Sequence, residues 1–319
     1  MRGAAGYAHP RYAASLSEFG RPRFLARSRG WVLERDIEGS PHRDAMWCYP
    51  LFACADWSAL RHDLEELRSE LVTLAVVTDP FGRYDRTTLE DAFPDVVIPF
   101  KDHFVTDLER DPADFVSAHH RRYSRKALAE LDVELCAEPA SLAEDWTRLY
   151  STLVTRHRIT GIAALSRFAL ERQLTVPGVT VLRAVHGSST VGITLWFVDG
   201  AVAYYHLAAF SPIGYELRAS FALFSSAIEL FARRGLRWLS LGAGAGLACD
   251  GADGLTRFKR GWSTGTRRAY FCGRVFDREA YAQLVARAVV EANGYFPAYR
   301  SGEFGRPAEA EAARSVAAE

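Results

Sequence analysis

The sequence contains no long apolar run. No stretch within its 319 residues approaches the ~18 consecutive apolar residues expected of a membrane-spanning helix. The segment Met1–Pro10 also lacks an apolar core of signal-peptide length. We therefore expect a cytoplasmic protein without an integral membrane span.

An excess of charge of either sign is also missing. The 39 Lys and Arg residues balance the 39 Asp and Glu residues, so no global field draws the chain to nucleic acid or to a membrane surface. Attraction to an anionic partner must therefore come from a local cluster of basic residues. Apolar residues make up 49% of the chain, enough for a substantial core in two domains or in one large domain.

Regular cysteine patterns and the common catalytic motifs are absent as well. The five cysteines are odd in number and irregular in spacing, which argues against a disulfide framework and a structural zinc site. The sequence has no Gly-x-Ser-x-Gly elbow, P-loop or His-Glu-x-x-His motif. We expect reduced, mostly buried thiols, no metal site and no tightly bound cofactor. The cysteines are Cys48, Cys54, Cys136, Cys249 and Cys272.

Hydrophobic periodicity predicts a mixture of helices and strands in the first part of the chain. The first fifty residues indicate irregular structure with short strands, such as Gly30–Leu33. Apolar residues at helical spacing from Trp57 to Leu71 predict a helix behind Asp56, a plausible N-cap. The elements expected next are a buried strand over 71–78, a turn at 79–82, a strand over 96–100, a basic helix over 112–131 and a strand over 133–135.

The second part of the chain carries clearer signals. Ser141 and Glu144 have the spacing of a capping box at the start of an amphipathic helix. Asp199-Gly200 predicts a two-residue hairpin turn, since both central positions of such a turn favour positive φ. The other elements expected are a helix over 166–174, strands over 179–185, 191–198 and 201–208, a long helix over 217–231 ended by Gly235, and a strand over 236–241.

The order of these elements predicts the fold class. A hairpin, a helix and a further strand imply a mixed sheet with a crossover helix packed on it, within an α+β fold. A fainter version of the same order precedes it, so we expect two similar modules over residues 1–140 and 141–300. The tail over residues 301–319 is rich in Ala, Glu, Arg and Pro, and we expect it to be disordered.

Candidate functional residues follow the last predicted strand. The run Gly242-Ala243-Gly244-Ala245-Gly246 would let a ligand approach the backbone closely at the end of that strand. Between Leu255 and Arg274 the chain has no acidic residue, so this stretch is either an anion site or a solvated strand face. Its six basic residues are Arg257, Lys259, Arg260, Arg267, Arg268 and Arg274.

A family resemblance rests on two motifs. The long aromatic helix and its strand lead into "LGAGAG" (residues 241–246) and then "GLTRFKRGW" (residues 254–262). This pattern resembles the FemAB-like branch of the GNAT acyltransferase superfamily over about residues 141–280. The stretch "HHRRYSRKALAELDVEL" (residues 119–135) is similar to the basic helix and strand that precede the second module of that family. The resemblance implies a GNAT fold with a mixed sheet, in two tandem modules.

The resemblance also implies a reaction. The best-known members transfer an aminoacyl group from aminoacyl-tRNA to an amine, typically on a peptidoglycan precursor. Phe258-Lys259 matches the family's "FK" pair near the reacting centre, which implies that Lys259 contacts the donor. An ammonium group there can stabilise the oxyanion that develops when an amine attacks an ester or thioester carbonyl. The donor site would include Gly242, Gly244, Tyr205, Arg218, Arg257 and Arg260.

Two further residues are candidates for proton transfer. Strand alternation puts Tyr204 and His206 on one face and Tyr205 on the other, and His206 is either a general base or a hydrogen-bonded core histidine. Glu216 precedes the long helix, where it could accept a proton from the amine or simply complement the helix dipole.

The loop before the long helix discriminates between donors. GNAT proteins that bind acetyl-CoA usually carry a glycine-spaced loop there, whereas residues 211–220 read SPIGYELRAS. We therefore expect an acyltransferase of the EC 2.3 type that takes aminoacyl-tRNA as donor and a cell-wall precursor or small-molecule amine as acceptor. The alternatives are an acyl-CoA-dependent N-acyltransferase of GNAT type and a GNAT-like module that binds an anionic ligand without catalysis.

Overall fold

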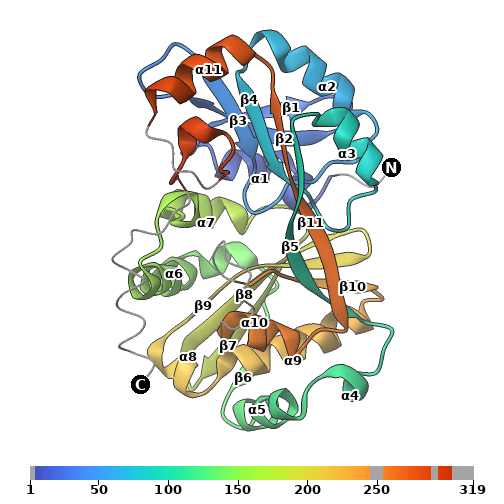
Figure 1. Ribbon diagram of the computed structural model, residues 1–319. Coiled ribbons are helices and arrows are strands. Elements are labelled where there is room, and N and C mark those ends of the chain that lie inside the picture. Colours follow the sequence, from blue (N-terminus) through green and yellow to red (C-terminus); the bar gives the residue numbers. More distant parts are fainter. Residues whose placement is uncertain (1–3, 245–253, 289–293, 304–319) are drawn as a thin grey trace.

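The structure is a computed structural model that describes residues 4–244, 254–288 and 294–303. Its strands form one mixed sheet in the order β1-β2-β3-β4-β11-β5-β10-β9-β8-β7-β6 (Figure 1). The α+β mixed sheet predicted from the sequence is therefore confirmed. The strands are β1 (Arg21–Leu25), β2 (Gly30–Asp36), β3 (Arg43–Trp47), β4 (Thr73–Val77), β5 (Val96–Asp107), β6 (Asp132–Leu135), β7 (Val179–His186), β8 (Ser189–Asp199), β9 (Val202–Phe210), β10 (Trp238–Gly242) and β11 (Gly265–Val275).

Helices pack on this sheet around two large clusters of buried apolar side chains. One cluster joins α1, α2, α6 and α7 to the sheet, and the other lies beneath α5, α9 and α10. Among the described residues, none of the helices is both long and apolar enough to span a membrane. The helices are α1 (Pro10–Ser15), α2 (Leu60–Glu66), α3 (Arg86–Ala92), α4 (Pro112–Phe115), α5 (Ala118–Leu128), α6 (Ala143–His157), α7 (Arg167–Gln173), α8 (Pro212–Glu216), α9 (Ala219–Arg233), α10 (Gly254–Arg260) and α11 (Arg278–Arg287).

Two long strands link the upper and lower parts of the molecule in Figure 1. Strand β5 lies between β10 and β11, and β11 continues upward to pair with β4. The strands of the two predicted modules therefore interleave within one sheet. The division of the chain at residues 1–140 and 141–300 stays a prediction, and the tail beyond residue 303 lies outside the described residues.

The crossover unit at the centre of the second part agrees with the prediction. Strand β9 runs into α8 and α9, and the chain returns through β10, which pairs with β9 in parallel. The apolar stripe of α9 is buried, as with Phe224 and Phe231. Gly235 follows the helix with φ of 72°, a left-handed conformation that glycine adopts without a Cβ penalty.

Three local predictions need correction. Ser141 lies in a 3₁₀ turn and donates its hydroxyl to the carbonyl of Glu138, so it forms no capping box, and α6 begins at Ala143. The predicted helix over 112–131 is interrupted because Val116 is extended and Ser117 caps a new helix. At the hairpin turn after β8, positive φ occurs at Gly200 but not at Asp199.

Candidate active site

The sheet opens between β9 and β10. Their parallel pairing covers Val202–Tyr204 against Trp238–Ser240 and then stops, although β9 continues to Phe210. Both strands are irregular at this point, β10 between Ser240 and Gly242 and β9 opposite residues 195 and 196. Bulges of this kind redirect side chains and recur beside active sites. The next three residues of β9 (205–207) are only half-buried although the strand is internal, so we take this opening as the candidate site.

Lys259 projects from α10 to this opening. Its side chain is buried, with 5% of the residue's surface exposed, and its Nζ donates to the carbonyl oxygen of Ala243 at 2.6 Å. The same Nζ lies 5.5 Å from the ring centroid of Tyr205, within cation–π range. A Cβ added to Gly242, which has φ of 73°, would lie 3.2 Å from Nζ. The structure therefore places Lys259, Tyr205 and Gly242 close together.

Phe258 has a different position from its neighbour. Its ring packs against Phe221, Phe224 and Trp262. Its carbonyl accepts a hydrogen bond from Nε2 of His120 at 2.9 Å, so Nδ1 of that imidazole accepts from the hydroxyl of Ser117. Phe258 is thus an anchor that holds α10 against α5 and α9.

A second imidazole lies near the lysine. His103 belongs to β5, whose next residue, Phe104, pairs with Gly242. Its Nδ1 is buried and has no hydrogen-bond partner among the described residues. Burial, together with the positive charge of Lys259, lowers the pKa of His103 to about 3. The ring is therefore neutral, which avoids a second positive charge beside the ammonium group.

His206 lies on the opposite face of β9. Its Nε2–H donates to Oε1 of Gln173 at 3.0 Å, and its Nδ1 accepts from the hydroxyl of Tyr7 at 3.1 Å. Burial lowers the pKa of His206 to about 3. Since both ring nitrogens are engaged within the chain, the structure supports a hydrogen-bonded core histidine and separates His206 from Lys259 by the strand. Tyr204 shares the His206 face, as strand alternation predicted.

Asp79 is a polar residue of this face that the sequence analysis assigned only to a turn. The turn forms as predicted, with Gly82 N–H donating to the Asp79 carbonyl. Its carboxylate accepts from the hydroxyl of Tyr204 at 2.8 Å and from the amide of Phe81. Burial raises the pKa of Asp79 to about 6. Its position directly after a fully buried strand was the sequence signal, because ligands gather at strand ends.

The predicted single basic patch over residues 255–274 is wrong. Residues 254–260 form a helix, so Arg257 and Arg260 are exposed on α10 while Lys259 points inward. Arg268 pairs with Asp102 on the neighbouring strand. Arg274 is buried and pairs with Glu65, and so contributes nothing to a surface field.

A different cluster of cations surrounds α10. Arg218 lies 4.5 Å above the ring of Tyr123 on α5, and Phe221 contacts both that ring and Phe258. The exposed cations of this region have no ion pair among the described residues, whereas Arg21, Arg86 and Arg167 are each ion-paired. We call this cluster the basic surface, and it comprises Arg122, Lys126, Arg218, Arg257 and Arg260.

The segment between β9 and α9 forms hydrogen bonds within itself. Ser211 caps α8, and the backbone amides over residues 214–218 donate to acceptors within the same segment. The amides of Gly214, Tyr215, Leu217 and Arg218 are therefore not free to bind a pyrophosphate. Glu216 is exposed at the end of α8, three residues before α9, so it does not lie at the N-terminus of the long helix.

The remaining predicted features are partly outside the described residues. Gly244 follows β10 beside the Lys259 contact, but residues 245–253, which include Gly246 and Cys249, are not described. The other four cysteines are free thiols. No group of three or more His, Cys, Asp or Glu side chains within the described ranges is arranged to hold a metal ion.

Comparison with known proteins supports an acyltransferase. Residues 116–260 match the family model of the acetyltransferase (GNAT) domain. A search of curated protein sequences found no match. Similar solved structures include FemX, which is 11% identical with a TM-score of 0.62, the overlap covering 86% of this chain and 93% of that one.

Two further solved structures have a similar fold. The C-terminal domain of a putative lysylphosphatidylglycerol synthetase from Agrobacterium fabrum is 14% identical with a TM-score of 0.61, over 86% of this chain and 90% of that one. L-PGS from Bacillus licheniformis is 12% identical with a TM-score of 0.56, over 86% and 94%. Residues 116–260 therefore match a GNAT-type domain, and the chain has a fold similar to that of FemX.

Proposed function

We propose that this protein forms an amide bond by transferring an activated acyl group to an amine at the opening between β9 and β10. The observation that carries this proposal is the position of Lys259. Its Nζ lies buried at the opening, held by the carbonyl of Ala243 and the ring of Tyr205. A buried lysine with a defined position is well suited to stabilise charge that appears during a reaction.

The chemistry follows from that position. The amine nitrogen attacks the carbonyl carbon of the donor, and the carbonyl oxygen becomes an oxyanion beside the Lys259 ammonium group. Collapse of the tetrahedral intermediate forms the amide and expels the carrier oxygen, which takes up the proton that the amine loses. Positioning of the two reactants supplies the rest of the rate.

The pair of Asp79 and Tyr204 lies on the His206 face of β9. Asp79 has a pKa of about 6 and is therefore ionised at neutral pH. It is hydrogen-bonded to Tyr204, the last residue of β9 that pairs with β10. Because Lys259 contacts Tyr205 on the opposite face, we propose a structural role for this pair, as for His206.

Aminoacyl-tRNA is the donor that the site supports best. The basic surface offers five exposed cations around α10 (Arg122, Lys126, Arg218, Arg257 and Arg260), which suits a polyanionic carrier. In the segment over residues 211–218, the amides that are bonded within the segment are not free to bind a CoA pyrophosphate. We propose a cell-wall precursor or a small-molecule amine as the acceptor, in keeping with the fold of FemX.

The test uses full-length protein with Lys259→Ala and, as a control, Arg233→Ala, which removes an exposed arginine that pairs with Glu229 within α9. A mixture of charged tRNAs with labelled amino acids is supplied with cell-wall precursors and simple amines, and labelled amide product is measured by mass spectrometry. We expect the Lys259 variant to lose roughly 100-fold in turnover, as for removal of an oxyanion donor, with an unchanged melting temperature. Equal turnover of wild type and Lys259→Ala would overturn the role of the lysine.

A further inference from the structure

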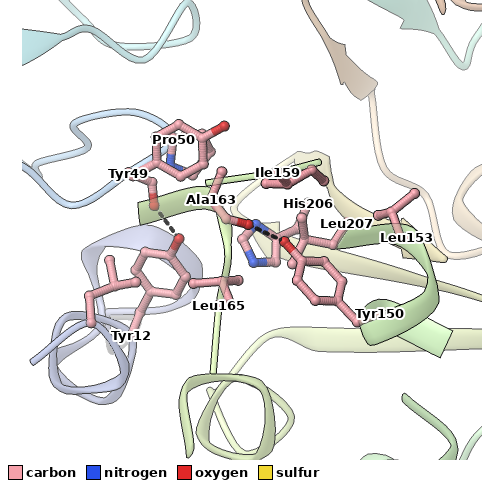
Figure 2. Close-up of a pocket in the computed structure, with 11 residues that line it drawn as sticks. Tyr12, Tyr49, Pro50, Tyr150, Leu153, Ile159, Ala163, Leu165, His206 and Leu207 are labelled. Carbon is pink, nitrogen blue, oxygen red and sulfur yellow. Dashed lines mark hydrogen bonds between the residues drawn. The ribbon is translucent and has the colours of Figure 1, made fainter. Parts of the chain in front are cut away.

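A cavity of about 170 Å³ lies on the His206 face of β9. Figure 2 shows side chains from α1, the segment after β3, the end of α6 and its following loop, and β9 arranged around it. It is distinct from the Lys259 contact, which involves Tyr205 on the other face. The lining residues are Tyr12, Leu16, Tyr49, Pro50, Tyr150, Leu153, Ile159, Ala163, Leu165, His206 and Leu207.

The cavity is chemically apolar. No Asp, Glu, Lys or Arg lines it. The Tyr12 hydroxyl donates to the carbonyl of Tyr49, and the Tyr150 hydroxyl donates to the carbonyl of Ala163 at 2.6 Å, as the dashed lines in Figure 2 mark. Both nitrogens of His206 are engaged by Gln173 and Tyr7. These groups therefore have little capacity left to bind a polar ligand, and a charged ligand would lose its hydration without compensation.

Its size limits the occupant. An apolar cavity of about 150 Å³ in another protein accommodates benzene. The present cavity therefore has room for one aromatic ring or a branched aliphatic group, and it is too small for an extended acyl chain of lipid length.

The cavity and the Lys259 contact border the same three residues of β9, one on each face of the strand. Tyr205 faces the lysine, and the bulge in β9 turns both His206 and Leu207 toward the cavity side. All three residues lie beyond the last pair between β9 and β10, where no β10 residue pairs with β9. To react at Lys259, a molecule with its apolar group in the cavity would have to extend past the end of the β9–β10 pairing.

We infer that this cavity binds an uncharged aromatic or branched aliphatic group carried by the amine acceptor. The acceptor is assigned to this side because the basic surface, which suits the donor carrier, is built on α5, α9 and α10 against the other face. This assignment rests on the proposed function, whereas the binding of an apolar group to the cavity does not.

The binding test uses toluene and indole as probes, with benzoate and ethanolamine as polar comparisons. Melting temperatures are measured for wild type, Ala163→Phe, which fills the cavity, and Ala140→Phe, which changes an exposed residue. At roughly 100 times its Kd, a binding probe should raise the melting temperature of wild type and Ala140→Phe by roughly 5 °C. Toluene and indole should have no effect on Ala163→Phe. Equal shifts in all three proteins, or no shift with either probe, would overturn the cavity as a ligand site.

The acceptor assignment is tested by inhibition. Toluene should compete with the acceptor amine and not with the donor, and phenethylamine should be a better acceptor than ethanolamine in wild type but not in Ala163→Phe. Competition with the donor would overturn the assignment. Probe binding without any detectable transfer would instead overturn the proposed function while leaving the cavity as a ligand site.

Discussion

Polar side chains have different environments on the two faces of β9. On one face, Lys259 donates to the carbonyl of Ala243 and contacts the ring of Tyr205, and exposed cations that form no ion pair with the described residues surround its helix. On the other face, His206 is neutral and both of its nitrogens are bonded within the chain. The comparison indicates that a polar group already satisfied by its own chain contributes mainly to stability, whereas a cation near an opening remains able to bind a ligand.

Arginines elsewhere in the chain show the same contrast between side chains that are satisfied within the chain and side chains that can bind a ligand. Asp44 is fully buried and accepts from both Arg35 and Arg300, which ties the segment after α11 to the N-terminal strands. Arg274 is similarly buried against Glu65. Identical residue types thus build the fold in one region and form the basic surface in another, and the difference lies in whether an acidic partner is within reach.

The largest expected effect on stability comes from breaking the His206 network. His206→Leu leaves the hydroxyl of Tyr7 and the amide oxygen of Gln173 without their partner, which should lower the free energy of unfolding by about 2–3 kcal/mol. Urea denaturation measures this loss. The double variant His206→Leu with Gln173→Leu should recover part of it, and a loss that does not depend on Gln173 would contradict the network.

Replacement of Asp79 should change the pH dependence of stability. Its folded-state pKa is raised to about 6, so between roughly pH 4 and 6 the folded chain holds a proton that the unfolded chain has lost. Stability from this group therefore falls as pH rises through that window. Asp79→Asn should be more stable than wild type by on the order of 2 kcal/mol at pH 7 and nearly equal to it at pH 4. Urea unfolding curves that differ equally at both pH values would contradict this sign.

Removal of two cations from the basic surface should weaken binding of an RNA carrier. Arg218→Ala with Arg257→Ala should lower the affinity for tRNA by roughly tenfold and reduce the slope of log affinity against log salt by about 2. The control is Arg86→Ala with Arg167→Ala, two exposed arginines that are ion-paired within their own helices. If both double variants bind alike, the basic surface has no special role.

The smallest expected effect concerns Gly242. Gly242 has a positive φ, which an alanine adopts only with strain, and the added Cβ would crowd Nζ of Lys259. Gly242→Ala should therefore lower the free energy of unfolding by about 1 kcal/mol and reduce turnover severalfold. Gly39 has a similar φ of 70° but no neighbour within 4 Å of an added Cβ. Gly39→Ala should therefore match the stability loss without changing turnover, and equal losses of turnover would contradict a local effect on the lysine.

Local and periodic features of the fold could be predicted from the sequence. The stripe of α9 and the glycine at residue 235 specify a helix and its end, and strand alternation correctly separated Tyr205 from Tyr204 and His206. These predictions succeed because their physical causes lie within a few residues. The capping box at Ser141 failed because Pro139–Leu142 form a 3₁₀ turn, so that α6 begins only at Ala143 with Leu142 as its N-cap.

Features that depend on distant partners could not be predicted. Arg274 looked like part of a basic patch, and only the pairing of β11 with β4 brings it near Glu65, more than two hundred residues away in sequence. The raised pKa of Asp79 likewise depends on burial and on its contact with Tyr204, which the sequence alone does not specify. The cavity beside His206 is assembled from segments separated by up to about two hundred residues.

A side-by-side measurement of Lys259→Met and His206→Leu tests the central contrast most directly. Single-turnover rate constants for acyl transfer and melting temperatures are determined for both variants and wild type. We expect Lys259→Met to melt at the same temperature as wild type and to react roughly 100-fold more slowly. His206→Leu should melt at a lower temperature than wild type, with a rate constant within severalfold of the wild-type value. The reverse outcome, a slow but stable His206 variant and an active Lys259 variant, would contradict the account.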